Sequence, residues 1–244
     1  MTKETNLNKI KEVARALLQT DIHMTEFSPM VVQHPFTNSG MVAVKTDGEI
    51  HIANITENES DLRGWRENMT GLIDKADNPH DIYMMVNKSY GLTFLHYAEP
   101  YLSAEDFSNI LSDAWIRSEN PNMDRNLNKA ALLKMFRKAD ADSLMSPEEQ
   151  EQLAALEDIV TVYRGLTSYN KSNIRALSWT LNYDVADWFA NRFREDGTVY
   201  EAQIKKAHIF ALFNGRSESE VIVDPAYLTN IQQAQEPENG LTLM

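Results

Sequence analysis

The chain has 244 residues, of which 43% are hydrophobic and 24% charged, and it contains no cysteine. This length and composition fit a folded protein with a substantial core, and the absence of cysteine excludes disulfides, thiolate nucleophiles and cysteine-ligated metal sites. A net charge of −13 argues against general binding to duplex DNA, because such binding depends on basic contacts with phosphates.

The first part of the chain is expected to be mainly helical. Apolar residues recur at helical spacing within residues 5–20, which predicts an amphipathic helix with one buried face. Residues 41–55 alternate apolar and polar side chains around Asp47 and Gly48, a pair typical of a tight hairpin turn. A further helix is expected near residues 61–76.

Two later helices carry recognisable start signals. Ser103 precedes a stripe of apolar residues at helical spacing, and its hydroxyl suits the N-cap position. Ser146 is followed by a proline and two glutamates, which predicts a capping box with Pro147 at the first helical position. This second helix is expected to end near Asp158.

From residue 159 onward the pattern changes to short β-like runs with one helix between them. That helix is expected to begin after Asp184 as its cap and to bury an aromatic face that includes Trp188, Phe189 and Phe193. The expected strands are residues 159–166, 176–180, 198–204, 208–212 and 220–223.

Two motifs in this strand-rich part carry polar side chains on expected strands. Arg164 is followed by Gly165; a guanidinium offers a permanent charge and a planar fork for phosphate oxygens, and glycine permits close approach of a ligand. Ser178 and Thr180 flank Trp179, so both hydroxyls are expected to face one side of a strand.

Glu218 and Glu220 open the last of the expected strands. Strand geometry would place the two carboxylates on one face, roughly 6.5 to 7 Å apart. Taken alone, the pair also fits the solvated side of an edge strand. A fixed carboxylate can alternatively stabilise a sugar that gains positive charge as its glycosidic bond breaks.

The motifs occur in one order, each with an expected strand: Arg164, then Ser178-Trp179-Thr180, then Glu218-Ser219-Glu220. This ordered set resembles the arginine, serine-x-threonine/serine and glutamate-x-glutamate motifs of the mono-ADP-ribosyltransferases, an NAD-consuming family that includes clostridial binary toxin enzymes and several bacteriophage enzymes. The resemblance implies an α+β fold with a split two-sheet β core and a helical N-terminal and middle part. It also implies NAD as co-substrate and no metal, and the six histidines show no spacing typical of a metal site.

The resemblance assigns roles to residues by their position. Glu220 would stabilise the ribosyl cation, and Glu218 would prepare the acceptor. Arg164 would bind the dinucleotide, and Ser178 would brace the cleft. The residues expected to hold NAD are Arg164, Gly165, Ser178, Thr180, Phe189 and Glu220. The residues expected to recognise the acceptor are Phe213, Asn214, Arg216 and Glu218.

On this basis residues 57–231 are expected to form the catalytic domain. Residues 1–56, a helix and a hairpin of unknown role, either belong to that domain or precede it, and residues 232–244 are expected to be a flexible tail. The sequence has no run of eighteen apolar residues, and its start leads into an amphipathic helix rather than a signal peptide. We therefore expect a cytoplasmic protein that does not enter a membrane.

The expected activity is transfer of ADP-ribose from NAD to a macromolecular acceptor with release of nicotinamide, in an intracellular toxin, a phage-defence protein or a prophage enzyme. In the resembling family the glutamate pair implies a protein arginine as acceptor, and a local excess of basic residues between positions 161 and 216 leaves RNA open as well. An antitoxin or inhibitor protein is a further candidate partner. Two alternatives stay open: an NAD glycohydrolase, and a catalytically silent interaction or virion protein that keeps the fold.

Overall fold

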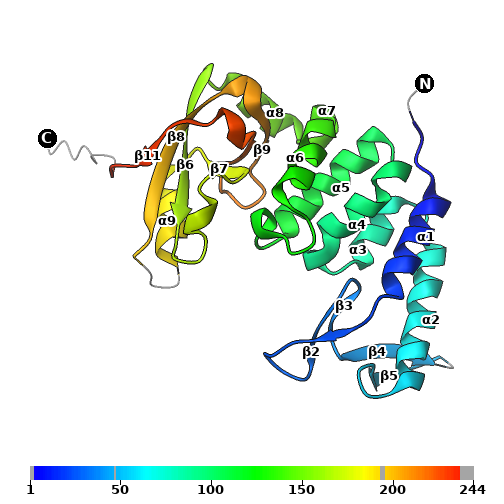
Figure 1. The fold of residues 1–244 in the computed structure, drawn as a ribbon. Coiled ribbons are helices and arrows are strands. Elements are labelled where there is room, and N and C mark those ends of the chain that lie inside the picture. Colours follow the sequence, from blue (N-terminus) through cyan, green and yellow to red (C-terminus); the bar gives the residue numbers. More distant parts are fainter. Residues whose placement is uncertain (1–2, 47, 193–195, 237–244) are drawn as a thin grey trace, which may run out of the picture. The chain divides into compact units, whose positions relative to one another are not determined.

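A computed structural model describes residues 3–46, 48–192 and 196–236 (Figure 1). The structure divides into two compact units, residues 1–127 and 128–244, whereas residues 1–56 were expected either to belong to a domain of residues 57–231 or to precede it. The reason is that helix α1 (Leu7–Leu18) packs against α2 (Glu59–Lys75) and α4 (Gly91–Ala98). The N-terminal segment therefore shares a core with helices that follow residue 56.

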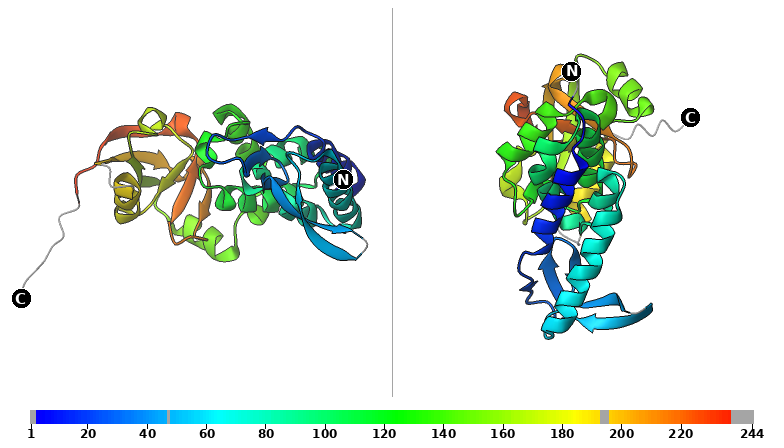
Figure 2. Two further views of the ribbon diagram at one scale, coloured as in Figure 1. Left: turned by 90° about the horizontal axis from the view of Figure 1, so that it is seen from below. Right: turned by 90° about the vertical axis from the view of Figure 1, so that its right-hand side faces the viewer.

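The first unit combines helices with two small antiparallel sheets in its described residues. Strand order is β1-β2-β3 in one sheet and β4-β5 in the other. Helices α1 and α2 lie side by side (Figure 2). The further helices are α3 (Pro79–Met85) and α5 (Ala104–Arg117), and the strands are β1 (His23–Met24), β2 (Val31–His34), β3 (Thr37–Ser39), β4 (Met41–Thr46) and β5 (Glu49–Asn54).

Side-chain caps explain where the helices of this unit begin. The Ser103 hydroxyl accepts a hydrogen bond from the Asp106 N–H at 3.0 Å, and the Asn58 side chain accepts from the Ser60 N–H at 2.9 Å. Such caps satisfy backbone donors that have no partner within the helix. The expected helices near residues 61–76 and after Ser103 are confirmed, as is the N-terminal helix.

The expected hairpin is confirmed as β4 and β5. Its strands pair from Met41 opposite Asn54 to Thr46 opposite Glu49, and Gly48 has a φ of 90°, which glycine adopts without steric cost. Asp47 lies outside the described residues. The apolar side chains Ile50 and Ile52 of β5 are largely exposed, at 74% and 64%, whereas Val44 of β4 is buried. The alternation that predicted the strands therefore marks a buried position in β4 but not in β5.

The second unit is built around an antiparallel sheet with the strand order β11-β8-β6-β7-β10-β9 in the described residues. The strands lie within two residues of the expected ranges, and β11 was not expected. The elements are α6 (Lys129–Lys138), α7 (Ala141–Leu144), α8 (Pro147–Ala155), β6 (Ile159–Leu166), β7 (Ser178–Thr180), α9 (Tyr183–Asn191), β8 (Thr198–Lys205), β9 (Ile209–Phe213), β10 (Glu220–Val223) and β11 (Thr229–Gln233).

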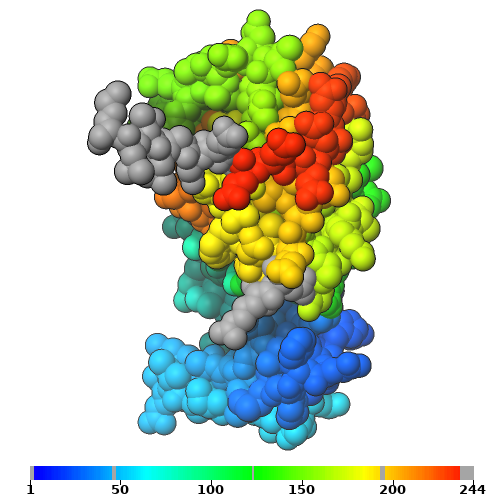
Figure 3. All heavy atoms as spheres, turned by 90° about the vertical axis from the view of Figure 1, so that its left-hand side faces the viewer, coloured from blue at the N-terminus to red at the C-terminus, as the bar shows by residue number. Residues whose placement is uncertain are grey.

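Strand β11 takes up the start of the segment that was expected to be a tail. Gln232 and Gln233 pair with β8, and the Ala234 N–H then donates to the Val199 carbonyl at 2.9 Å. Ala234 also packs near α9, and Figure 3 shows β11 in red close to α9 in yellow on this surface. Residues 237–244 lie outside the described residues.

The helix starts of the second unit match the sequence in one case and differ in the other. Ser146 and Glu149 form the predicted capping box at α8, which ends at Ala155, a little before Asp158. Helix α9 is capped by Asn182 rather than Asp184: the Asn182 side chain accepts from the Asp184 N–H at 2.8 Å. Because the helix starts two positions earlier than expected, Asp184 lies in its first turn.

Helix α9 packs against the sheet with small alanine side chains. The aromatic face that was expected to be buried is not the buried face of this helix. Ala186 and Ala190 are buried, whereas Trp188 is 62% exposed. A Cβ atom at Gly165 would lie 2.1 Å from the Ala186 carbonyl oxygen, and one at Gly197 equally close to the Ala190 oxygen. The helix therefore approaches the strands too closely for large side chains between them. Phe193 lies outside the described residues.

These elements confirm a fold that mixes helices with antiparallel sheets. Among the described residues, no helix combines the length and the apolar character that crossing a bilayer requires. Strands β6, β7 and β10 of the second unit carry Arg164, Ser178 and Glu220, so their sheet positions the candidate site.

Candidate active site

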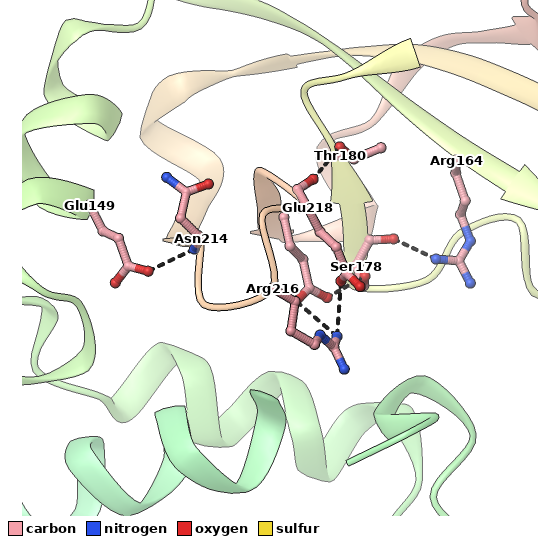
Figure 4. A network of polar contacts seen from close by, with 8 residues as sticks. Glu149, Arg164, Ser178, Thr180, Asn214, Arg216 and Glu218 are labelled. Atoms are coloured by element: carbon pink, nitrogen blue, oxygen red, sulfur yellow. Dashed lines mark hydrogen bonds and ion pairs between the residues drawn. The ribbon is translucent and has the colours of Figure 1, made fainter. Parts of the chain in front are cut away.

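Polar groups from three strands meet in the second unit (Figure 4). The Nη1 atom of Arg164, on β6, donates to the backbone carbonyl of Ser178 at 2.5 Å. The Ser178 hydroxyl, on β7, donates to Oε1 of Glu220, on β10, also at 2.5 Å. A hydrogen bond from a hydroxyl to a carboxylate is charge-assisted and strong. The structure thus connects three residues that are far apart in the sequence.

Strand pairing explains how Arg164 reaches its neighbour. Strand β6 pairs with β8 along its whole length, from Ile159 to Leu166, but with β7 only through Tyr163 and Thr180. Beyond this pair the ladder between β6 and β7 does not continue. The guanidinium of Arg164 donates to the Ser178 carbonyl across this interruption, where a regular sheet would have a backbone hydrogen bond.

Glu220 lies in the interior of the sheet. Strand β10 is placed between β7 and β9, and Glu220 is only 7% exposed. The alternative interpretation of this glutamate as the solvated side of an edge strand is therefore excluded. A buried carboxylate is costly unless it is hydrogen-bonded or paired with a charge. Ser178 and Arg216 provide such partners.

Arg164 is a charged group in a poorly solvated position. Burial lowers the pKa of its guanidinium to about 10; the Glu220 carboxylate opposes this shift, and the nearby Arg192 adds to it. The side chain still carries its positive charge at neutral pH. Its Nε atom is buried and has no hydrogen-bond partner among the described residues. The guanidinium thus keeps a donor that the described residues do not use.

Glu218 does not share a strand with Glu220, contrary to the expectation. Strand β10 begins at Glu220, and the residues on both sides of Glu218 have positive φ angles, 57° at Ser217 and 44° at Ser219. Residues other than glycine rarely adopt this left-handed backbone conformation. The Thr180 hydroxyl donates to the Glu218 carbonyl at 2.6 Å and so holds the loop against β7.

Arg216 contacts both carboxylates of the glutamate pair. Its Nη2 atom lies 3.0 Å from Oε2 of Glu218 and 3.9 Å from Oε2 of Glu220. The Arg216 side chain is 39% exposed, compared with 22% for Glu218 and 9% for Glu220. Arg216 was expected from the sequence to face an acceptor, and its ion pairs with the two glutamates were not expected. The alternation of Arg216, Glu218 and Glu220 was the available signal.

Thr180, Gly165 and Phe189, which were expected to contact NAD, have contacts within the protein. Thr180 is 6% exposed, and its hydroxyl is engaged with the Glu218 carbonyl and with the Asn182 N–H at 3.1 Å. Gly165 permits the approach of α9 rather than of a ligand. Phe189 is partly buried and lies under the Arg192 guanidinium, 5.0 Å from the ring centroid to its Cζ.

Two residues expected to recognise the acceptor have structural contacts as well. Phe213 ends β9 and is 2% exposed, so it belongs to the core and cannot contact an acceptor directly. The Asn214 N–H donates to Oε1 of Glu149 at 2.7 Å, and its side chain hydrogen-bonds Gln152. Asn214 thus attaches the start of the 214–219 loop to α8. This role could not be read from the turn sequence.

The site combines guanidinium groups with a buried carboxylate. Both Arg192 and Glu220 are close enough to Arg164 to influence it electrostatically. Such a combination can bind phosphates through guanidinium groups and place a carboxylate next to a sugar. Within the described residues, no group of three histidine, aspartate or glutamate side chains is arranged to hold a metal ion.

Comparison with known proteins finds no matching family model, no similar curated protein and no similar solved structure. The resemblance in the motifs therefore has no independent support from these comparisons. The chemistry of the site has to be inferred from its own side chains, their burial and their contacts.

Proposed function

We propose that this protein is a mono-ADP-ribosyltransferase that transfers ADP-ribose from NAD to a macromolecular acceptor and releases nicotinamide. The observation that carries the proposal is the hydrogen-bonded connection from Arg164 through Ser178 to the buried Glu220. Three residue types needed for one reaction are adjacent although they come from separate strands. Pairing between β6 and β7 is limited to Tyr163 and Thr180 within one six-stranded sheet, whereas the activity implies a β core split into two sheets.

In this proposal Arg164 binds the phosphates of NAD. Its guanidinium is charged, poorly solvated and has a donor that the described protein groups leave unused. An electrostatic interaction is stronger in such surroundings than in water. The nucleotide is thereby fixed with its nicotinamide ribose toward Glu220, which is the position that the next step requires.

Glu220 acts on the bond between nicotinamide and ribose. As this bond breaks, its electron pair leaves with nicotinamide, and positive charge develops on the sugar. The fixed carboxylate stabilises this charge more in the transition state than in the ground state. Ser178 holds the carboxylate in place through its hydrogen bond, so less reorganisation is needed when the charge appears.

Glu218 prepares the acceptor. Its side chain is more exposed than that of Glu220 and belongs to a loop instead of the sheet, so it can meet a macromolecule at the surface. A guanidinium fits beside both carboxylates, as Arg216 demonstrates. We therefore favour a protein arginine over RNA as the acceptor. Action in the cytoplasm, as a toxin, a defence protein or a prophage enzyme, is part of the same proposal.

The proposal is tested with NAD that carries a label in its adenylate half, incubated with cell extract and purified protein. We expect nicotinamide release and a labelled product that protease removes. Glu220→Gln should abolish both signals, and Glu201→Gln is the matched control: Glu201 lies on β8 of the same sheet and accepts from Gln232 at 2.6 Å.

Other outcomes identify the alternatives. A label that survives protease but disappears with nuclease would show that the acceptor is RNA and not a protein. Nicotinamide release without any labelled macromolecule would identify an NAD glycohydrolase. If the wild type releases no nicotinamide, the remaining hypothesis is an interaction protein without catalytic activity.

A further inference from the structure

The first unit contains a cavity that is separate from the candidate active site. Its volume is about 610 Å³, which lies within the range of about 300 to 1,000 Å³ typical of small-molecule sites. Its lining comes from three segments: residues 25–38, which include β2, residues 87–90, which follow α3, and residues 118–126, which follow α5. All three segments belong to the first unit, so this unit forms the cavity by itself.

Contacts between the three segments hold the walls of the cavity in place. The Asn87 N–H donates to the Pro35 carbonyl at 2.7 Å, which attaches the second segment to the first. Lys88 and Glu119 form an ion pair, which connects the second segment to the third. The cavity is therefore bounded by segments that are distant in the sequence but joined to one another in the fold.

Five carboxamide side chains line the cavity, and two of them support its walls. The Asn87 side chain accepts from the Ser89 N–H at 3.2 Å, and the Asn126 side chain donates to the Thr93 hydroxyl at 3.0 Å. The other three have no side-chain hydrogen bond to another described residue: Gln33, Asn38 and Asn120. Each offers one carbonyl acceptor and an NH₂ group with two donors, which complement the polar edges of nucleobases.

The charged side chains of the lining leave a positive charge available. Glu119 is paired with Lys88, and the Asp124 carboxylate accepts from the Asn126 N–H at 2.8 Å. Arg125 is exposed and has no ion pair with another residue that the structure describes. Its guanidinium offers a planar set of donors that suits the oxygens of a phosphate group.

Two aromatic rings also line the cavity. Burial raises the pKa of the Tyr90 hydroxyl, and the charge of Arg125 opposes this shift, so the guanidinium lies near this side chain. Phe27 is 95% exposed, and its ring is therefore accessible to a ligand. Aromatic rings of this kind stack on nucleobases.

We propose that this cavity is a nucleotide-binding site, in which the base contacts the aromatic rings and the unused carboxamides while the phosphate binds Arg125. An apolar ligand would leave the carboxamides without partners, which is unfavourable. A metal ion is disfavoured because Glu119 and Asp124 are already engaged. The nucleotide is either free or part of a single strand. The inference is independent of the proposed function, because Arg164 and Glu220 belong to the other unit.

The test is a calorimetric titration of the purified full-length protein with AMP, GMP, CMP and UMP. We expect saturable binding of at least one of them, and binding at least about tenfold weaker for the corresponding nucleoside and for ribose 5-phosphate. Arg125→Gln and Asn120→Ala should each weaken binding about tenfold. Arg63→Gln is the matched control, because Arg63 is an exposed arginine of the same unit that does not line the cavity.

A further variant distinguishes this cavity from the candidate active site. Arg164→Lys should leave mononucleotide binding unchanged. Binding that is lost in Arg164→Lys but kept in Arg125→Gln would overturn the inference and leave the proposed function intact. Absence of saturable binding by all four nucleotides, or equal affinity for ribose 5-phosphate, would also overturn it.

A single-stranded RNA hexamer separates the two sources of the nucleotide. Tighter binding of the hexamer than of the mononucleotides would assign the cavity to a strand, and weaker binding would assign it to a free nucleotide. Both results support the site, provided that Arg125→Gln weakens the binding. Nicotinamide release is measured separately, and its absence would refute the proposed function without affecting this inference.

Discussion

Two buried carboxylates four residues apart, Glu220 and Asp224, have different surroundings. Glu220 is 7% exposed and Asp224 is 4% exposed, and each is paired with a more exposed arginine, Arg216 and Arg137 respectively. In burial and charge the two regions are nearly equivalent. Burial of an acidic side chain therefore does not by itself indicate chemistry.

The partners distinguish the two regions. Asp224 accepts the Ala226 N–H at 3.1 Å and so begins the short 3-10 turn Pro225–Tyr227. Its carboxylate maintains the local backbone. Glu220 instead accepts a hydroxyl from the adjacent strand and lies near Arg164, whose pKa it raises. A carboxylate held by side chains from several strands can face a ligand. A carboxylate that caps a turn is already engaged with the backbone of that turn.

The largest expected effect is at Glu220. Glu220→Gln keeps the size of the side chain but removes the negative charge that stabilises the sugar. We expect nicotinamide release to fall about 1,000-fold, which corresponds to about 4 kcal/mol of transition-state stabilisation. Steady-state kinetics with NAD measures this effect, and circular dichroism checks that the variant is folded. A fall of less than tenfold would contradict the role of Glu220.

Gly165→Ala tests whether the neighbour of Arg164 is structural. Its Cβ would lie 2.1 Å from the Ala186 carbonyl oxygen, so α9 or β6 has to move. We expect the free energy of unfolding to fall by about 3 kcal/mol, measured by urea denaturation. Gly71→Ala, where an added Cβ meets no atom within 4 Å, is the control and should not lower it. Equal stability of the two variants would be inconsistent with the close contact of α9.

Asp224→Asn should give the opposite result to Glu220→Gln. Loss of the charge weakens the pair with Arg137 and the cap on the Ala226 N–H. We expect the free energy of unfolding to fall by about 2 kcal/mol, while the folded variant releases nicotinamide at nearly the wild-type rate. Thermal unfolding and an activity assay on the same sample provide both values. A loss of turnover equal to that of Glu220→Gln would remove the distinction between the two regions.

Ser178→Ala is expected to lower turnover less than Glu220→Gln does. The substitution removes the hydroxyl that positions Glu220 but leaves the carboxylate and the Ser178 carbonyl. Nicotinamide release should fall about tenfold, or about 1.4 kcal/mol. Ser178→Thr, which keeps a hydroxyl, should recover part of the rate. A threonine variant that is as slow as the alanine variant would argue against positioning through this hydrogen bond.

The sequence predicted most elements because their signals are local. Ser103 and Ser146 are caps next to their own helices, and the β-rich run that became β6 was placed with its observed bounds. The buried face of α9 depends instead on Gly165, which lies on another element and removes the space for aromatic side chains. A helical pattern contains no information about its distant partner.

The candidate site was predictable in part for the same reason. The order of the motifs allowed us to expect that Arg164, Ser178 and Glu220 lie together, and the structure connects them. The loop position of Glu218 depends on positive φ angles at Ser217 and Ser219, which no serine signals in a sequence. The division of the chain after residue 127 also depends on packing between helices. The sequence around this boundary does not have the composition of a linker.

The most direct test of the central claim is a calorimetric titration of NAD into Glu220→Gln, in which the nucleotide stays intact. If Arg164 and Glu220 serve one NAD site, this variant binds NAD saturably, and adding Arg164→Lys weakens binding at least about tenfold, because lysine lacks the planar fork. Arg137→Lys in the same background should leave binding unchanged. Absence of binding by folded Glu220→Gln, or equal affinity with and without Arg164→Lys, would contradict the account.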